Sequence, residues 1–155
     1  MRGLHLVEAF CVFSVALVAA DNPFLGTWKL SVAKSKATPG TLEKQSTVVF
    51  ATDGNGIKRT VTGIDADGNP LNLSDTIPWD GMDHKVNGPA GSPPALVAVK
   101  VVNPNTLDIT VKVNGKVVVS GKSVVSKDGK TMTGTFKGED PKGRKFDNVE
   151  VYEKQ

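Results

Sequence analysis

The sequence predicts an all-β fold: an antiparallel up-and-down barrel of about eight to ten strands, which follows an N-terminal signal peptide. Three observations support this prediction. Short segments of alternating apolar and polar residues recur along the chain, Asp-Gly and Asn-Gly dipeptides separate many of them, and no window has the apolar repeat of a helix. A meander of this length usually closes, because closure removes unpaired strand edges.

The first 20 residues have the three parts of a cleavable export signal. Arg2 gives a positive start, residues 9–19 are apolar, and Val18 and Ala20 are small enough for a signal peptidase site. The apolar run is shorter than the roughly 20 residues of a membrane-spanning helix. We therefore expect cleavage after Ala20 rather than a membrane anchor, and a periplasmic or extracellular protein.

Residues 21–155 are predicted to form one barrel domain. Its net charge is +3, and its lysines are scattered rather than gathered with aromatic residues, so no nucleic-acid partner is expected. The only cysteine, Cys11, lies in the leader, which leaves the domain without a disulfide or a thiolate metal ligand. We expect no metal, no cofactor, and a monomer or weak homo-oligomer.

Alternation and turn residues place the elements in order. The predicted strands are 24–33, 43–52, 56–64, 70–79, 82–87, 95–102, 106–113, 116–125, 130–138 and 144–153. The strongest turn signals are Asp53-Gly54, Asn55-Gly56, Asp67-Gly68, Asp80-Gly81, Asn114-Gly115 and Asp128-Gly129, where Gly and Asn accept the positive φ of hairpin turns. Residues 88–94 are an irregular loop long enough to lie at a barrel mouth.

The same alternation predicts which side chains face the interior. The apolar phase comprises Leu71, Leu73, Ile77, Trp79, Met82, Val86, Leu107, Ile109, Val111, Val113, Met132 and Phe136. Strands 95–102 and 116–125 are apolar on both faces. They are either simply valine-rich or covered by a neighbouring element or a partner.

Two polar residues, Asp75 and His84, fall in the apolar phase of neighbouring strands. If Asp80-Gly81 is a two-residue turn, Ile77 pairs with His84, and Asp75 lies diagonal to the imidazole. The pair would then be a polar anchor for a ligand or, as a less favoured hypothesis, the acid and base of an enzyme. The alternative is a structural pair, or two side chains that point to solvent.

Arg59 shares the phase of its apolar neighbours and is a candidate interior cation, with a surface arginine as the alternative. The candidate ligand-binding residues are Arg59, Leu73, Asp75, Ile77, Trp79, His84, Ile109, Phe136 and Tyr152. Residues 21–155 contain no His-rich zinc motif, nucleophile elbow or phosphate-binding glycine loop, so no catalytic residues are assigned.

The segment Phe24-Leu25-Gly26-Thr27-Trp28-Lys29-Leu30 resembles the first strand of the calycins, which comprise lipocalins and fatty-acid-binding proteins. Residues 149–154 resemble the last strand of the fatty-acid-binding branch, and 126–133 are similar to secreted bacterial lipocalin-like proteins. The resemblance implies a lipocalin-like barrel that binds a small apolar or amphipathic molecule. Gly26 and Trp28 are interpreted as a structural plug at the closed end, packed under a basic side chain from the last strand, rather than as ligand contacts.

Two departures from the fatty-acid-binding pattern stand out. Residues 34–42 are too few for the helical pair that those proteins insert after the first strand. Tyr152 matches their last-strand tyrosine, but Glu150 stands where they carry an arginine for the ligand carboxylate. The sequence leaves open whether Glu150 and Tyr152 or Val149 and Val151 face inward. The alternative to a ligand carrier is an envelope module with a packed interior that acts through its surface.

Overall fold

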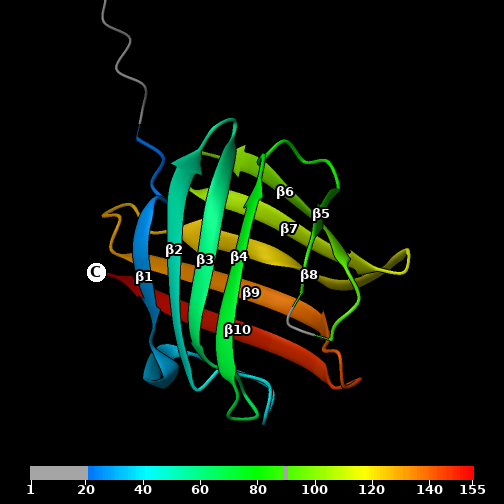
Figure 1. The fold of residues 1–155 in the computed structure, drawn as a ribbon. Helices are drawn as coiled ribbons and strands as arrows, with labels where there is room; N and C mark the ends of the chain where they lie inside the picture. Colours follow the sequence, from blue (N-terminus) through cyan, green and yellow to red (C-terminus); the bar gives the residue numbers. More distant parts are fainter. Residues whose placement is uncertain (1–20, 89–90) are drawn as a thin grey trace, which may run out of the picture.

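The computed structural model describes residues 21–88 and 91–155, and it confirms the all-β prediction. One antiparallel sheet of ten strands curls into a nearly closed barrel, in the order β4-β3-β2-β1-β10-β9-β8-β7-β6-β5 (Figure 1). The strands are β1 (Gly26–Leu30), β2 (Gln45–Asp53), β3 (Gly56–Ile64), β4 (Pro70–Ile77), β5 (His84–Val86), β6 (Ala95–Asn103), β7 (Thr106–Val113), β8 (Lys116–Val125), β9 (Thr131–Glu139) and β10 (Lys145–Lys154). The predicted signal peptide, 1–20, lies outside the described residues, as do two residues of the predicted 88–94 loop.

Tight turns with positive φ connect several neighbouring strands, as predicted. Asn114 and Gly115 have φ values of 50° and 76° and join the paired residues Val113 and Lys116. This pattern is that of a type I′ turn, whose twist matches that of the flanking strands. Within the part of the chain that the structure describes, no helix is long and apolar enough to cross a membrane.

The predicted hairpin between β4 and β5 is wrong. These strands are the two ends of the strand order and do not pair, so Ile77 does not lie opposite His84. After β4 the chain instead aligns with β6, where Asp80 pairs with Lys100 and His84 pairs with Val97. The turn signal at Asp80-Gly81 is therefore local, while the neighbour of β5 is set by the long-range pairing with β6.

Met82 is a related correction, because its predicted interior position is wrong. Its side chain is 62% exposed, beside the Asp80 carboxylate that accepts a hydrogen bond from the Met82 N–H at 2.9 Å. This Asx-type contact turns the chain outward before β5 begins.

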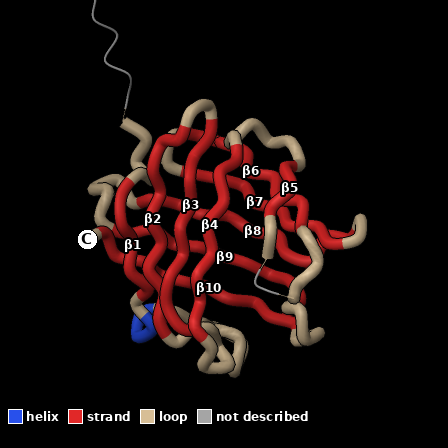
Figure 2. Tube along the Cα trace, viewed as in Figure 1, coloured by secondary structure: helices blue, strands red, loops and turns tan. Residues whose placement is uncertain are grey.

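The connection between β1 and β2 contains only one 3-10 turn, η1 (Val32–Lys34), and no helical pair (Figure 2). It runs along β10, where the Lys36 backbone pairs with Val149. The Asn148 side-chain oxygen accepts hydrogen bonds from the Thr38 N–H and the Thr41 hydroxyl, both at 3.1 Å. The segment thus covers β10, whose polar side chains hold it in place.

Trp28 lies in the core, where it is fully buried. Its indole N–H donates to the Phe24 carbonyl at 2.7 Å, and the Lys154 ammonium lies 5.0 Å from the ring centroid. A Cβ at Gly26 would lie 3.0 Å from Lys154 Cε, so the glycine leaves room for the lysine stem. Cation–π attraction and apolar burial therefore act together where the first and last strands meet.

The outer face of β6–β8 carries exposed apolar side chains, namely Leu96, Val102, Val117 and Val124, whereas the exposed Val101 pairs with the buried Leu107 and shares its inner face. The register places Lys100, Asp108 and Lys122 side by side across these strands. This charged row separates Leu96 and Val117 from Val124, so the apolar residues do not form one continuous surface.

Gly63 provides a test of the register between β2 and β3. Its φ is 152°, and a Cβ there would lie 2.1 Å from the Gln45 carbonyl oxygen. Gly63→Ala should lower the free energy of unfolding by about 2–4 kcal/mol, as measured by urea denaturation. The neighbouring change Thr62→Ala, at an exposed site, should cost less than about 1 kcal/mol. Equal losses for the two variants would contradict this register.

Candidate functional site

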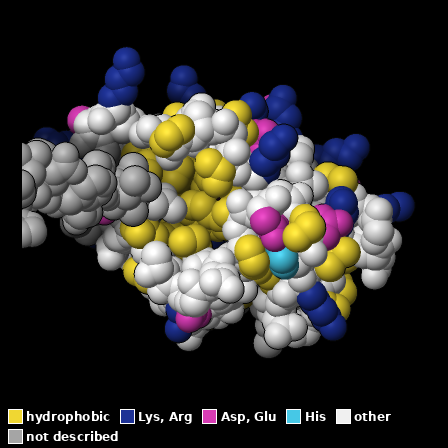
Figure 3. Space-filling view, turned by 90° about the horizontal axis from the view of Figure 1, so that it is seen from above, with side chains coloured by type: hydrophobic (Ala, Val, Ile, Leu, Met, Phe, Trp, Pro, Cys, Tyr) yellow, Lys and Arg dark blue, Asp and Glu magenta, His cyan; other side chains and the backbone are white. Residues whose placement is uncertain are grey.

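The barrel encloses a cavity of about 210 Å³. Figure 3 shows the molecule from above, and hydrophobic side chains surround a hollow in the face that is turned to the viewer. Most lining residues are apolar or aromatic. The polar and charged residues in the lining are Glu43, Ser46, Arg59, Asp75, Ser123, Glu150 and Tyr152. An apolar cavity with a few convergent polar groups is the usual form of a small-molecule site.

Three aromatic rings form one wall. The Phe24 and Trp79 centroids are 5.6 Å apart with an interplanar angle of 90°, and Phe50 and Trp79 are 5.8 Å apart at 79°. Both contacts have the edge-to-face geometry that aromatic quadrupoles favour. The rings come from the segment before β1, from β2 and from the segment that follows β4, so this wall joins distant parts of the chain.

Phe136 lies over two glycines on the opposite wall. A Cβ at Gly134 would lie 2.4 Å from Phe136 Cε2, and one at Gly121 would lie 2.5 Å from Cδ1. Gly121 is the β8 partner of Phe136. The missing side chains let the ring lie close to β8 and β9, which leaves space in front of it.

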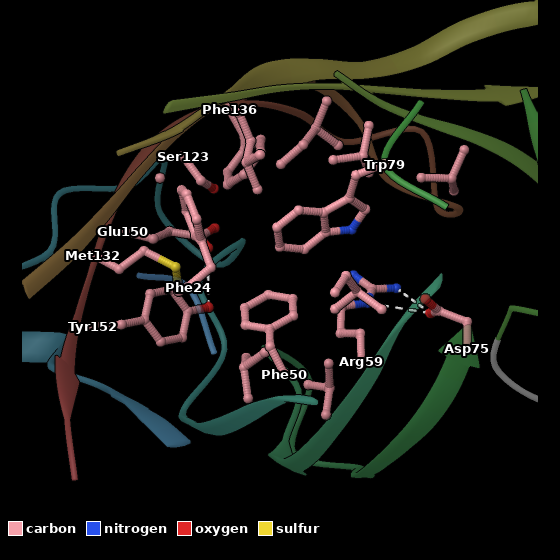
Figure 4. Close-up of a pocket in the computed structure, with 18 of the residues that line it drawn as sticks. Phe24, Phe50, Arg59, Asp75, Trp79, Ser123, Met132, Phe136, Glu150 and Tyr152 are labelled. Atoms are coloured by element: carbon pink, nitrogen blue, oxygen red, sulfur yellow. Dashed lines mark hydrogen bonds and ion pairs between the residues drawn. The ribbon is translucent and has the colours of Figure 1, made fainter. Parts of the chain in front are cut away.

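Arg59 and Asp75 form an ion pair on one side of the cavity (Figure 4). They are direct partners on β3 and β4, and Arg59 Nη2 lies 2.6 Å from Asp75 Oδ2. The side chain of Asp75 is 11% exposed and that of Arg59 is 41% exposed. The carboxylate neutralises the cavity's arginine, whose outer part reaches solvent.

A second polar group lies across the cavity from Arg59 and Asp75, where Glu150 and Tyr152 of β10 face inward. Of the two alternatives left open by the sequence, Glu150 and Tyr152 therefore face the interior, rather than Val149 and Val151. The Tyr152 hydroxyl donates to Glu150 Oε2 at 3.2 Å. Ser46 lies near them because Leu30 on β1 pairs with Tyr152 on one side, and β2 adjoins β1 on the other. Among the described residues, Glu43 Oε2 and Ser46 Oγ are buried without a hydrogen-bond partner of good geometry.

Burial raises the pKa of Glu43, because removal from water disfavours the charged carboxylate. The nearby Ser46 hydroxyl lowers this pKa, the negative charge of Glu150 raises it, Arg59 lowers it and Asp65 raises it. Desolvation outweighs the favourable contacts, so the carboxyl holds its proton more strongly than in water.

The pKa of Glu150 is also raised by burial, against the stabilising contacts of the Tyr152 hydroxyl and Asn148. Burial and the charges of Glu150 and Glu43 raise the pKa of Tyr152 well above its ordinary value, so the phenol stays neutral. The two carboxyl groups and the phenol therefore form an acidic end of the cavity with unused hydrogen-bonding capacity.

Seven of the sequence-predicted candidate residues line the cavity: Arg59, Asp75, Ile77, Trp79, Ile109, Phe136 and Tyr152. Leu73 packs against the core outside the lining. His84 is at the β5 edge, where its Nε2 lies 2.9 Å from Asp80 Oδ1. The anticipated contact between Asp75 and His84 is wrong, because Asp75 binds Arg59 and His84 binds Asp80.

Further lining residues were not predicted from the sequence, among them the polar Glu43, Ser46 and Ser123 and the aromatic Phe24 and Phe50. The alternation of Ser46 with Val48 and Phe50 along β2 could have revealed Ser46. Glu43 precedes the strand and carries no periodic signal. Within 21–88 and 91–155, no three His, Cys, Asp or Glu side chains come together as a metal site.

No family model matches the chain, and no curated protein matches it. Solved structures do. A Schistosoma mansoni fatty acid binding protein in complex with arachidonic acid aligns with a TM-score of 0.60 and 18% identity, over 86% of this chain and 96% of that one. Zebrafish ileal bile acid-binding protein complexed with cholic acid gives 0.56 and 10%, over 86% and 99%. As-p18, an extracellular fatty acid binding protein, gives 0.57 and 15%, over 86% and 97%.

This likeness shows the fold: the ten-stranded barrel of this chain has the same overall arrangement as these proteins. The likeness spans nearly the full length of each of these proteins. The fold predicted from the resemblance to calycins is therefore confirmed for this chain.

The buried acids predict a pH-dependent stability. Each titrates near 4.5 when unfolded and higher when folded, so the folded chain loses stability as the pH rises through the raised pKa. Glu43→Gln and Glu150→Gln should therefore raise the free energy of unfolding more at pH 8 than at pH 5, by urea denaturation.

The exposed change Glu139→Gln on β9 is the control for this experiment. It should alter the free energy of unfolding by less than about 0.5 kcal/mol at both pH values. A stabilisation by Glu43→Gln and Glu150→Gln that is equal at the two pH values would contradict the burial of these acids.

Proposed function

We propose that this protein is an exported barrel that binds a small apolar or amphipathic molecule in its central cavity. The observation that carries the proposal is the cavity of about 210 Å³ with its largely apolar and aromatic lining. A hydrophobic cavity of about 150 Å³ is enough to bind benzene. A ligand with one aromatic ring or a short alkyl chain therefore fits.

The structural neighbours support a carrier role. Two of them are described in complex with arachidonic acid and with cholic acid. The cavity here is smaller than the roughly 300–1,000 Å³ of pockets for drug-sized ligands. The proposed ligand is accordingly more compact than a long-chain fatty acid or a bile acid.

Two observations favour a carrier over a packed envelope module. The interior contains an open cavity, whereas a packed module needs a filled core. The exposed apolar residues of β6–β8 are divided by a charged row, whereas a docking surface needs a continuous patch.

A matched pair of substitutions on β6 tests the cavity. Val99 lines it, whereas Val102 is exposed on the same strand. Wild-type protein should bind a compact neutral molecule such as 2-phenylethanol, as measured by calorimetry and by the emission of Trp79. Val99→Phe should weaken this binding at least about tenfold by occupying the space, and Val102→Phe should leave it within about twofold.

The outcomes of this test separate clearly. Absence of binding and of thermal stabilisation by compact neutral apolar compounds would overturn the carrier proposal. Equal binding by the two phenylalanine variants would show that the ligand sits outside the cavity.

Export is tested separately by expression from Met1 in a bacterial host. The apolar leader and the small residues Val18 and Ala20 predict a mature chain that begins at Asp21, by mass spectrometry of the extracytoplasmic fraction. Ala20→Phe should block cleavage, because signal peptidase needs a small residue there. A cytoplasmic product that retains Met1 would refute export.

A further inference from the structure

The acidic end of the cavity contains buried polar atoms that have no hydrogen-bond partner of good geometry in the described part of the chain. Ser46 is only 3% exposed and lines the cavity, and its hydroxyl lies close enough to Glu43 and Tyr152 to lower their pKa values without forming a well-aligned hydrogen bond to either. Oε2 of Glu43 is equally buried and unpartnered. Buried polar groups are nearly always paired, and the exceptions call for an explanation. A ligand that donates hydrogen bonds at this point supplies one.

The charge balance of the lining specifies the sign of that ligand. The lining has one cationic side chain, Arg59, and Asp75 already neutralises it at 2.6 Å. Arg59 lowers the pKa of Glu43 without contacting it, and neither Glu43 nor Glu150 forms an ion pair with any residue that the structure describes. A carboxylate ligand would meet two acids and no free positive charge, whereas a cation would balance them.

The number of hydrogen-bond donors on a primary ammonium also matches the acceptors at the acidic end of the cavity. A protonated primary amine carries three donors and no acceptor. The acidic end offers the Glu43 carboxyl, the Ser46 hydroxyl oxygen and the Glu150 carboxyl. Within residues 21–88 and 91–155, Glu150 accepts a well-aligned hydrogen bond from Tyr152, whereas Glu43 Oε2 and the Ser46 hydroxyl have no partner of good geometry. Hydrogen bonds between an ammonium and carboxylates are also stronger than those between neutral groups.

The rest of the cavity fits an aromatic or short aliphatic body. Figure 4 places Phe50 and Trp79 between Glu150 and Tyr152 on one side and Arg59 on the other, and Phe24 beside Glu150, where its ring contacts Trp79. A ligand whose charged end lies at Glu43 and Glu150 would therefore place its apolar part against these rings. The cavity of about 210 Å³ limits that part to about one ring.

We propose that the cavity selects compact primary amines, and that Glu43, Glu150 and Ser46 bind the ammonium while the aromatic wall binds the apolar part. This inference rests on the proposed carrier function and names its ligand class. It differs from the fatty-acid pattern, in which an arginine meets a ligand carboxylate. The raised pKa values of the two acids agree with it, because an ammonium would stabilise their ionised forms.

The test uses three compounds of similar shape: 2-phenylethylamine, 2-phenylethanol and 3-phenylpropionate. At pH 7.5 the amine should bind at least about tenfold more tightly than the propionate and more tightly than the alcohol, by calorimetry. Glu43→Gln and Glu150→Gln should each weaken amine binding about tenfold and leave alcohol binding within about threefold. Glu139→Gln, an exposed acid, is the control and should change neither.

A measurement on the wild-type protein does not depend on the folding of any variant. Amine binding should strengthen as the pH rises from 5 to 7.5, with protons released on binding. These protons would come from Glu43 and Glu150, which face Ser46, Tyr152, Asn148, Arg59 and Asp65. The release is measured by calorimetry in buffers of different ionisation enthalpy.

The outcomes separate this inference from the carrier proposal. Binding of the alcohol with no preference for the amine would overturn the amine inference alone. Tighter binding of the propionate, or loss of amine affinity in Asp75→Asn but not in the glutamate variants, would also overturn it. Failure of all three compounds to bind would overturn both proposals.

Discussion

The pairing of β1 with β10 is the contact on which the rest of the barrel depends. Every other strand neighbour in the order is also a neighbour in sequence, so hairpins account for the two halves β1–β4 and β5–β10. The register of Trp28 with Lys154 and of Leu30 with Tyr152 is the strand pairing that joins the halves, and isolated bridges from Lys36 to β10 and from Asp80 to β6 reinforce it. The buried indole, the ammonium above its ring and the absent side chain of Gly26 all lie at this seam. A long-range pairing of this kind costs loop-closure entropy, which a fully buried tryptophan helps to offset.

The same seam assembles the acidic end of the cavity. Ser46 is on β2 and Tyr152 is on β10, and they approach each other only because β1 lies between these strands. The connection after β1 adds Glu43 just before β2. By contrast, Arg59 and Asp75 are partners within one hairpin and need no closure. The cavity thus combines a locally encoded neutral ion pair with a cluster of acidic groups that is complete only in the closed barrel.

This division explains how much could be predicted from the sequence. Alternation and Asx-Gly turns are local signals, and they predicted ten strands with nearly correct bounds, including 56–64, 106–113 and 116–125. The same kind of local signal at Asp80-Gly81 predicted a pairing of β4 with β5 that the structure does not have. The actual partner of β5 is β6, and a local turn signal carries no information about that choice. The phase of β10 was ambiguous because Val149 and Val151 are also apolar. In the structure their backbone contacts the η1 segment, with Ser31 N–H donating to the Val151 carbonyl at 2.8 Å. Glu43 lies outside any periodic segment and was beyond prediction from sequence pattern.

The position of Glu150 links stability to binding. Its partner on β9 is Gly134, and the next residue across the sheet is Ser123 on β8. Small neighbours leave the carboxyl free to reach the cavity rather than pack against another side chain. Within the protein it receives support from the Tyr152 hydroxyl and Asn148, which does not compensate for its removal from water. An acid in this position weakens the empty barrel whenever it ionises, and it interacts most strongly with a cation that enters the cavity. Because both effects come from the same desolvated charge, the loss of stability at high pH and the proposed preference for a cation are two results of one interaction.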